Sequence, residues 1–285
     1  GTLGVGNITG VAAGLSVGGA GALFWLLFSS VFSAAIKYAE TVLARDVSRS
    51  SPAKTAGMPA VIRCTFPHTG ATLGKLYALL SLGLAFSMGA ALQARAAAES
   101  VTLPAALPPA LFSLILTGFA ALVLLFGEGV ARVTEVLIPL ATLLYSLMCL
   151  AVIFSHGSRL PEVLCSVVSS AFTFRAGAGG IFAFLFTRAL REGVCRGLLS
   201  NEAGAGTSAY AHAQNTAVTP CEEGMLGIAE VVADTVVLCP LTAFTVLLAV
   251  EDPTKIPEPF ALLNAAFSPT LGPVYRFLMP FCLFC

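Results

Sequence analysis

The first ten residues read GTLGVGNITG and combine four glycines with Asn7 and Thr9 in an otherwise apolar stretch. Glycine lets the backbone leave helical geometry without a side-chain clash, and lipid cannot satisfy the polar atoms of Asn7 and Thr9. One interpretation is the unwound middle of a broken transmembrane helix, in which the freed backbone groups face a cavity and bind a ligand. The alternative is an intact helix whose small residues let a neighbouring helix pack closely.

A second polar interruption, residues 191–206, reads REGVCRGLLSNEAGAG. It lies about five spans after the first, so the two interruptions are predicted to cross the membrane in opposite directions. Paired interruptions in two inverted halves are the sequence pointer to the midplane site of a secondary transporter. The pairing therefore favours the broken-helix interpretation of residues 1–10. The repeat itself is inferred from hydropathy and spacing, because the halves show no residue-level similarity.

The composition is that of a membrane protein. The chain is 57% hydrophobic and 11% charged, with zero net charge, whereas a soluble domain carries about 25% charged residues. We therefore predict an all-α, polytopic protein surrounded by the lipid bilayer. The charge balance argues against a nucleic-acid partner, and the eight cysteines have no zinc-site spacing. Both ends lie in apolar segments, so we expect a fragment; nothing in the sequence bears on the oligomeric state.

Hydropathy predicts about seven spans, each near the ~20 apolar residues needed to cross a membrane. They cover 22–43, 76–98, 111–126, 133–154, 163–190, 225–250 and a segment from 260 onward. The polar stretch 44–74 is predicted to be an irregular loop. It is rich in Lys and Arg, so the positive-inside rule places the loop 44–75 in the cytoplasm and the protein in the cell membrane. The single transmembrane domain 1–285 would then hold most of a first repeat, 1–160, and the start of a second, 161–285.

Several ordered motifs extend along the chain. They are GTLGVGNITGV at 1–11, GAGALFW at 19–25, KYAE at 37–40, RGLLSNEAG at 196–204 and DT at 234–235. Together they resemble the alanine or glycine:cation symporter family, whose chains are longer at both ends. The resemblance implies a leucine-transporter-like inverted-repeat bundle of the APC superfamily, here truncated. It also implies sodium-coupled import of a small neutral amino acid, alanine or glycine, by alternating access.

The resemblance also implies roles for the first motif. The backbone amides of Val5 and Gly6 would hold the substrate carboxylate, in agreement with the preference of a helix N-terminus for an anion. Asn7 would offer its amide oxygen to one sodium ion, and the carbonyl groups of Thr2 and Leu3 would serve a second. Unwound backbone supplies such oxygen ligands without net charge. Sodium is thus the implied coupling ion, and no organic cofactor is expected.

Three further residues complete the substrate site that the resemblance implies. Gln93 would face the substrate, although an interhelical hydrogen bond is the alternative. Glu192 and Gly193 would line the pocket from the second interruption. Glu192 departs from the family, which commonly has an aromatic or amide residue there. A carboxylate in the pocket would hold the amino group, bind a proton or shift selectivity; the alternative is an ion pair with Arg188, Arg191 or Arg196.

Other polar residues are expected to be structural. Asp234 lies deep in a span and must be paired or face water, because a bare carboxylate there is expensive; a coupling role is the alternative. His212 is predicted to be a packed, hydrogen-bonded histidine. Asn201 and Glu202 are expected to tie down the loop after the second interruption through charge-assisted hydrogen bonds.

Other classes of function fit the sequence less well. A cation channel would use the glycines in a filter, but paired inverted interruptions argue against it. A transporter of altered substrate, or one coupled to protons, remains the alternative within the same class. An enzyme is not predicted, because the chain has neither H-E-x-x-H nor G-x-S-x-G and its three histidines fall on dispersed segments.

Overall fold

The structure, a computed structural model, describes residues 4–50, 57–87, 93–96, 114, 118, 129–172, 179–215 and 217–284. Every regular element in this part is helical, which confirms the predicted all-α class. Within these described ranges, four stretches are long and apolar enough to cross a membrane, as expected of a polytopic protein. These are Gly21–Ser50, Gly70–Ser87, Glu135–Ser155 and Pro220–Ala249.

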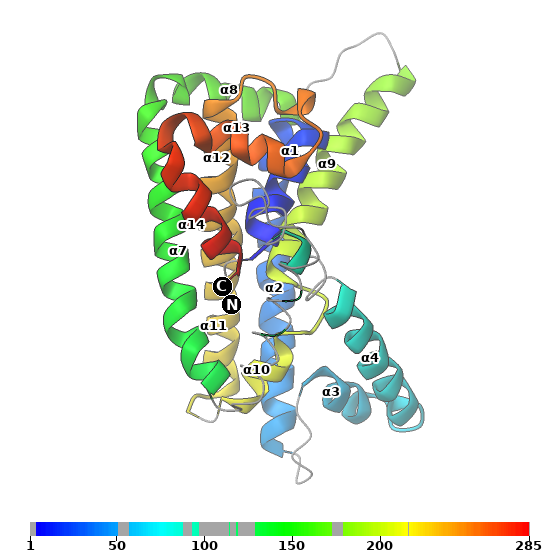
Figure 1. Cartoon of the computed structure of the whole chain (residues 1–285). Helices are drawn as coiled ribbons and strands as arrows, with labels where there is room; N and C mark the ends of the chain where they lie inside the picture. Colours follow the sequence, from blue (N-terminus) through cyan, green and yellow to red (C-terminus); the bar gives the residue numbers. More distant parts are fainter. Residues whose placement is uncertain are drawn as a thin grey trace.

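Helix α2 (Gly21–Ser50) runs through the middle of the structure. It packs against α9 (Gly179–Asn201) and against α11 (Pro220–Val231). The π-helical segment η4 (Val232–Leu238) joins α11 to α12 (Cys239–Ala249), so this span has a widened turn in its middle. Helix α7 (Gly129–Ser155) flanks α12 on the outer side (Figure 1).

The start of α11 follows directly from its sequence. Thr219 and Glu222 form a capping box, in which each side chain bonds the backbone N–H of the other residue. Pro220 occupies the first helical position, where the missing N–H costs nothing. The helix that carries the buried Glu223 and the partly exposed Glu230 therefore has a fixed starting point.

Helices α2 and α9 pack so closely that their backbones are almost in contact. A Cβ atom added at Gly193 would lie 2.4 Å from the carbonyl oxygen of Ala22 and 2.7 Å from Cβ of Trp25. One at Gly197 would lie 2.0 Å from Oγ of Ser29. Gly193 and Gly197 are four residues apart and so share one face of α9. Small residues on one face are what let membrane helices pack closely.

The predicted irregular loop 44–74 is wrong in its described parts. Helix α2 continues to Ser50, and α3 (Met58–Thr65) and α4 (Gly70–Leu84) follow. Lys and Arg are good helix formers, so their number did not signal the end of the helix. Ala44 and Val61 also pack into a small buried cluster with α10 (Ala209–Gln214), which stabilises the helical arrangement.

The predicted continuous spans 163–190 and 260 onward are also wrong. The first divides into α8 (Leu160–Ala171), which at 12 residues is too short to cross a bilayer, and α9. The second is a pair of short helices, α13 (Pro259–Leu271) and α14 (Pro273–Phe284), joined at Gly272 with φ of 53°. Both α8 and α13 lie across one end of the bundle (Figure 1). The predicted span 111–126 lies outside the described residues except for positions 114 and 118.

The close approach of α2 and α9 leads to a stability prediction. Gly193→Ala should lower the free energy of unfolding by about 1–3 kcal/mol, because the new methyl group meets backbone atoms that cannot rotate away. The measurement is the thermal unfolding midpoint of the full-length protein in detergent.

The matched control is Gly83→Ala near the end of α4, where an added Cβ meets nothing within 4 Å. This change should leave the midpoint unchanged or raise it, because alanine is the better helix former by about 1 kcal/mol. Equal midpoints for Gly193→Ala and the wild type would contradict the close packing.

Candidate functional site

The first polar interruption is a widened helix and not unwound backbone in its described part. Residues Gly6–Gly10 form the π-helical segment η1, which leads into α1 (Val11–Gly18). The Gly10 N–H donates to the Val5 carbonyl at 2.8 Å, and the Thr9 hydroxyl donates to the same oxygen at 2.9 Å. The predicted unwound state of 6–10 is therefore corrected to π-helix, a geometry frequent at functional sites. Thr2 and Leu3 lie outside the described residues.

Asn7 connects η1 to η4. Its side chain is 1% exposed, and Nδ2 donates to Oδ1 of Asp234 at 2.5 Å. Its backbone carbonyl accepts a hydrogen bond from the Thr242 hydroxyl at 2.8 Å, and that hydroxyl also contacts the Tyr145 hydroxyl at 2.6 Å. Both the amide and the backbone of Asn7 are thus fixed by residues that lie more than 100 positions away.

Asp234 is paired, as its depth required. It is 4% exposed and contacts the amide of Asn7 and, at 3.4 Å, the hydroxyl of Thr235. These partners are neutral, so the hydrogen bonds satisfy the carboxylate without cancelling its charge. The carboxylate and hydroxyl oxygens of Asp234 and Thr235, with the side chain of Asn7 beside them, are hard donors, which fit an alkali cation such as sodium.

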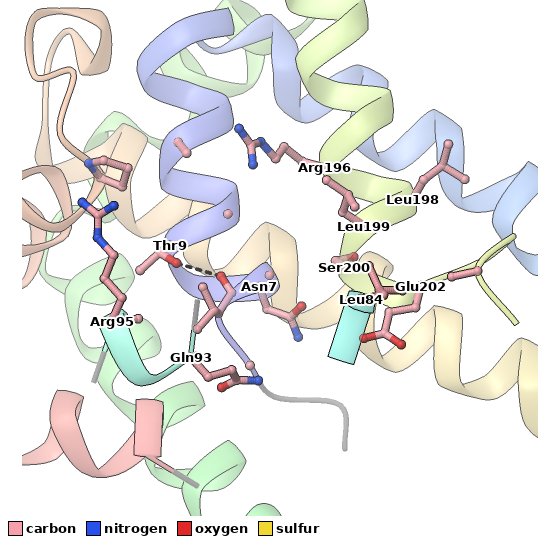
Figure 2. Close-up of a pocket in the computed structure, with 18 of the residues that line it drawn as sticks. Asn7, Thr9, Leu84, Gln93, Arg95, Arg196, Leu198, Leu199, Ser200 and Glu202 are labelled. Atoms are coloured by element: carbon pink, nitrogen blue, oxygen red, sulfur yellow. Dashed lines mark hydrogen bonds between the residues drawn. The ribbon is translucent and has the colours of Figure 1, made fainter. Parts of the chain in front are cut away.

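A cavity of about 740 Å³ lies beside η1 (Figure 2). Its lining comes from the first segment, from the end of α9, from the end of α4, from residues 93–96 and from the start of α13. These residues include Gly4, Val5, Gly6, Asn7, Gln93 and Ser200. Gln93 is close to the start of η1, because a Cβ atom built on Gly4 would lie 3.4 Å from its Nε2. The structure therefore brings together four of the predicted site residues, Val5, Gly6, Asn7 and Gln93, which are far apart in the sequence.

Glu192 and Gly193 take different positions. Among the described residues that line the cavity, neither is present; Arg196 lines it instead. Oε2 of Glu192 lies 3.3 Å from Nη2 of Arg196, one helical turn further on, so the ion-pair alternative for Glu192 is confirmed. Gly193 faces α2 at backbone distance. Arg196 was not predicted to line the cavity. Its spacing of four residues from Glu192 indicated an ion pair between the two side chains and gave no sign of a place in the cavity.

The second predicted interruption, 191–206, is helical as far as Asn201. The disruption is confined to a short turn in which Glu202, Gly204 and Gly206 have φ values of 55°, 88° and 71°. The Gly204 N–H donates to Oε1 of Glu40 at 2.9 Å, and the Glu202 carboxylate accepts from the Thr207 hydroxyl. The glycines of 191–206 thus serve two purposes: the first two allow helix packing and the last two allow this left-handed turn.

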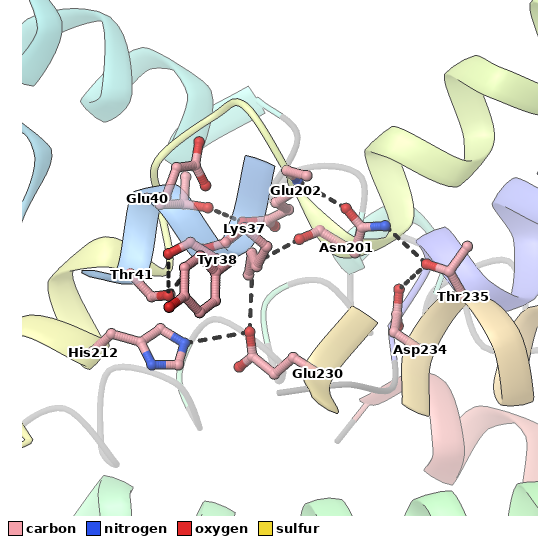
Figure 3. A network of polar contacts seen from close by, with 12 residues as sticks. Lys37, Tyr38, Glu40, Thr41, Asn201, Glu202, His212, Glu230, Asp234 and Thr235 are labelled. Carbon is pink, nitrogen blue, oxygen red and sulfur yellow. Dashed lines mark hydrogen bonds and ion pairs between the residues drawn. The ribbon is translucent and has the colours of Figure 1, made fainter. Parts of the chain in front are cut away.

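A chain of polar contacts leads from this turn into the bundle (Figure 3). Lys37 is 3% exposed, and its Nζ donates to the Asn201 carbonyl at 2.8 Å and lies 3.4 Å from Oε2 of Glu230. Nδ2 of Asn201 in turn donates to the Thr235 hydroxyl at 2.9 Å, next to Asp234. Asn201 therefore has the structural role that the sequence predicts. Lys37 was the missed partner, and its place in KYAE was the available signal.

His212 is packed and hydrogen-bonded, as predicted. Its Nδ1 lies 2.5 Å from Oε1 of Glu223, and its Nε2 lies 3.4 Å from Oε2 of Glu230. Nδ2 of Asn215 donates to the other oxygen of Glu223 at 2.7 Å. The hydrogen bond to Glu230, with that to Glu223, raises the pKa of His212 above its usual value despite the opposing effect of burial.

The chain is similar in sequence to known transporters. Residues 1–285 match the sodium:alanine symporter family. The chain is 31% identical to the sodium/alanine symporter AgcS of Methanococcus maripaludis, over 87% of this chain and 55% of the relative. It is 31% identical to the probable sodium/glutamine symporter GlnT of Bacillus subtilis, over 95% and 56%. It is 30% identical to the sodium/proton-dependent alanine carrier protein of Bacillus sp. strain PS3, over 87% and 54%.

The chain spans about half the length of the curated relatives that it matches. The match nevertheless covers all of its residues and includes the segment that carries Asn7 and the segment that carries Asp234. The family is one of sodium-coupled amino-acid transporters and not of enzymes. This chain therefore belongs to the sodium:alanine symporter family.

Proposed function

We propose that the protein carries out sodium-coupled symport of a small neutral amino acid, alanine or glycine, into the cell by alternating access. The observation that carries the proposal is the cavity beside η1, which adjoins the buried contact between Asn7 and Asp234. A substrate space and a negatively charged, oxygen-rich site thus share one residue, Asn7. Shared ligands are a direct way for the binding of an ion to change the affinity for a substrate.

For the substrate, we propose that the amides of Val5 and Gly6 hold the carboxylate. Both residues lie where the helical backbone of η1 begins, and the first amides of a helix have no partner within it. Gln93, whose Nε2 lies beside Gly4 at the start of this segment, then contacts the substrate next to these amides. Gly4, Gly6 and Gly10 lie along the lining and leave room beside the backbone. Glu192 acts through Arg196, and Gly193 acts by setting the distance between α9 and α2.

Glutamine is the second candidate substrate. The cavity of about 740 Å³ is far larger than alanine requires, and Arg196 supplies a polar wall. A relative with 31% identity is named a probable sodium/glutamine symporter. A direct comparison of alanine, glycine and glutamine distinguishes these substrates.

For the ion, we propose that sodium binds at Asn7 with the carboxylate of Asp234 nearby. The carbonyl groups of Thr2 and Leu3 are proposed ligands of a second sodium ion. Asn7 uses its Nδ2 on Asp234, so the amide is oriented by the carboxylate and its oxygen is directed elsewhere. In this arrangement Asp234 supplies the negative charge, and Asn7 fixes the position of the groups around the ion.

We propose a leucine-transporter-like inverted-repeat bundle for the complete protein, with residues 1–160 in the first repeat and 161–285 in the second. The segment 44–75, from the end of α2 to the start of α4, would face the cytoplasm of a cell whose plasma or inner membrane holds the protein. Support comes from the excess of Lys and Arg in that segment and from the two widened helical turns, η1 and η4, which meet at the Asn7–Asp234 contact.

The test of this function is uptake by the full-length protein in proteoliposomes. An inward sodium gradient should drive saturable accumulation of radiolabelled alanine or glycine, and replacement of sodium by choline should abolish it. Unlabelled glutamine should compete if the larger substrate is accepted. Flux that does not saturate with substrate would instead indicate a channel, and accumulation that is equal without sodium would overturn sodium coupling.

Asn7→Ala should raise the sodium concentration needed for half-maximal uptake by about tenfold. The reason is that losing a hydrogen bond to a charged group costs about 1.5–3 kcal/mol, of which about 1.4 kcal/mol is a factor of ten in affinity. Sodium titration of the initial uptake rate measures the effect. Ser16→Ala is the control, because within the described part of the chain the Ser16 hydroxyl bonds inside α1 alone, to the Ala13 carbonyl. An unchanged sodium response in Asn7→Ala would remove Asn7 from the site.

Gln93→Leu should raise the KM for the amino acid by roughly 2- to 10-fold, corresponding to the ~0.5–1.5 kcal/mol of one neutral hydrogen bond. The sodium response should stay as in the wild type, because Gln93 lines the cavity and not the Asp234 contact. The same substitution at the exposed Gln214 is the matched control. A wild-type KM in Gln93→Leu would leave Gln93 with an interhelical hydrogen bond as its only role.

A further inference from the structure

A buried ionic cluster lies away from the cavity, where α10 packs against α2 and α11. His212 is 9% exposed, and its ring lies between two carboxylates of α11, those of Glu223 and Glu230. Both ring nitrogens face a carboxylate oxygen, at 2.5 Å for Nδ1 and 3.4 Å for Nε2. The proposed transport steps make no use of this cluster.

The number of hydrogen-bond donors in this arrangement decides whether the cluster needs an additional proton. A neutral imidazole has one N–H donor and one acceptor nitrogen, whereas an ionised carboxylate has acceptors only. A neutral His212 between two ionised carboxylates would therefore place a lone pair against one of them. One additional proton removes this conflict, either on the second ring nitrogen or on the facing carboxyl oxygen. We propose that His212, Glu223 and Glu230 form a proton-binding site, and that Lys37 links its occupancy to the end of α9.

The surrounding charges favour an occupied site. From α2, Lys37 faces Glu230, Glu40 bonds the Gly204 amide, and Arg45 donates to the Val218 carbonyl at 3.4 Å. With the extra proton, the two positive groups Lys37 and His212 balance the two glutamates. Without it, the cluster carries one excess negative charge in a largely buried position, which is costly.

Glu230 is the carboxylate of the cluster that is most accessible from outside the protein. The side chain of Glu230 is 36% exposed, while those of Glu223 and Lys37 are 2% and 4% exposed. A proton that leaves the site therefore passes from Nε2 of His212 or from Glu230 to a base outside the cluster, and a proton that enters arrives by the same groups. No other bond is made or broken in the exchange.

Lys37 connects the proton site to the region of Asp234. Its ammonium group is shared between Glu230 and the carbonyl of Asn201. When His212 loses its proton, Glu230 loses a partner and competes more strongly for Lys37. The Asn201 carbonyl then loses part of its donor at the end of α9. Because Asn201 also bonds Thr235, beside Asp234, the change extends to the site where we propose that sodium binds.

The first test measures proton binding and does not depend on transport. The pKa of His212 is raised, so its stabilising effect is fully present below its unfolded value of about 6.5 and is lost as the pH rises through the higher folded value. The thermal midpoint of the full-length protein should exceed that of His212→Gln by more at about pH 6 than at about pH 9. A difference that is equal at both pH values would overturn the proton site.

His156→Gln is the matched control, since the ring of His156 bonds a carbonyl group, that of Val152, and not a carboxylate. It should leave the pH dependence of the midpoint as in the wild type. If His212→Gln does not fold, Glu223→Gln keeps the test decisive. This variant removes one carboxylate and retains the histidine, so the transition should move to lower pH; an unmoved transition would also overturn the proposal.

The second test measures the link to sodium, and it rests on the proposed function. In proteoliposomes, the half-saturating sodium concentration of the wild type should rise with pH. By linkage, if bound sodium raises the pKa of the proton site by one unit, the half-saturating sodium concentration rises by about tenfold between the protonated and the deprotonated site. Glu223→Gln should shift this dependence to lower pH, and His156→Gln should not. Parallel pH profiles for wild type and Glu223→Gln would overturn the link through Lys37, whereas absence of uptake in every sample would instead contradict the proposed function.

Discussion

The contact between Asn7 and Asp234 is the constraint on which the central part of the structure depends. A carboxylate this deeply buried is stable only if it is hydrogen-bonded or neutralised. Its partner at 2.5 Å lies 227 residues away, so two distant segments must come together before either can be satisfied. Thr242, about two turns further along the same span, then holds the backbone of Asn7. The cavity, the widened turns and the end of α9 are arranged around this contact.

The polar groups form a connected set and not a collection of separate pairs. Lys37 bonds the end of α9, Asn201 bonds Thr235, and Asp234 bonds Asn7. In a medium of low dielectric constant, each of these groups is costly unless its neighbour is in place. A disturbance at one end therefore has consequences along the set. This property suits a transporter, in which binding of one species must alter the site of another.

Much of the architecture could be predicted from the sequence, including the all-α class, the membrane setting and the importance of residues 1–10. The widened helix at 6–10 could not, because a run of glycines is compatible with unwound, π-helical and closely packed backbone alike. The interpretation of 191–206 failed for the same reason: Gly193 and Gly197 pack against α2, while Gly204 and Gly206 turn the chain. The pairing of Asn7 with Asp234 depends on tertiary contact, which local composition does not encode.

The glycine contact between α9 and α2 also bears on how the protein can move. Backbones that meet without intervening side chains are interlocked, and an interlocked pair resists sliding, since any shift would press Ser29 or Trp25 into the opposite helix. We therefore expect α2 and α9 to move together as one rigid body. Displacements must be taken up where the chain is less regular, at the turn through Glu202 and Gly204 or at the π-helical segments. That turn follows the end of α9 directly and borders the cavity.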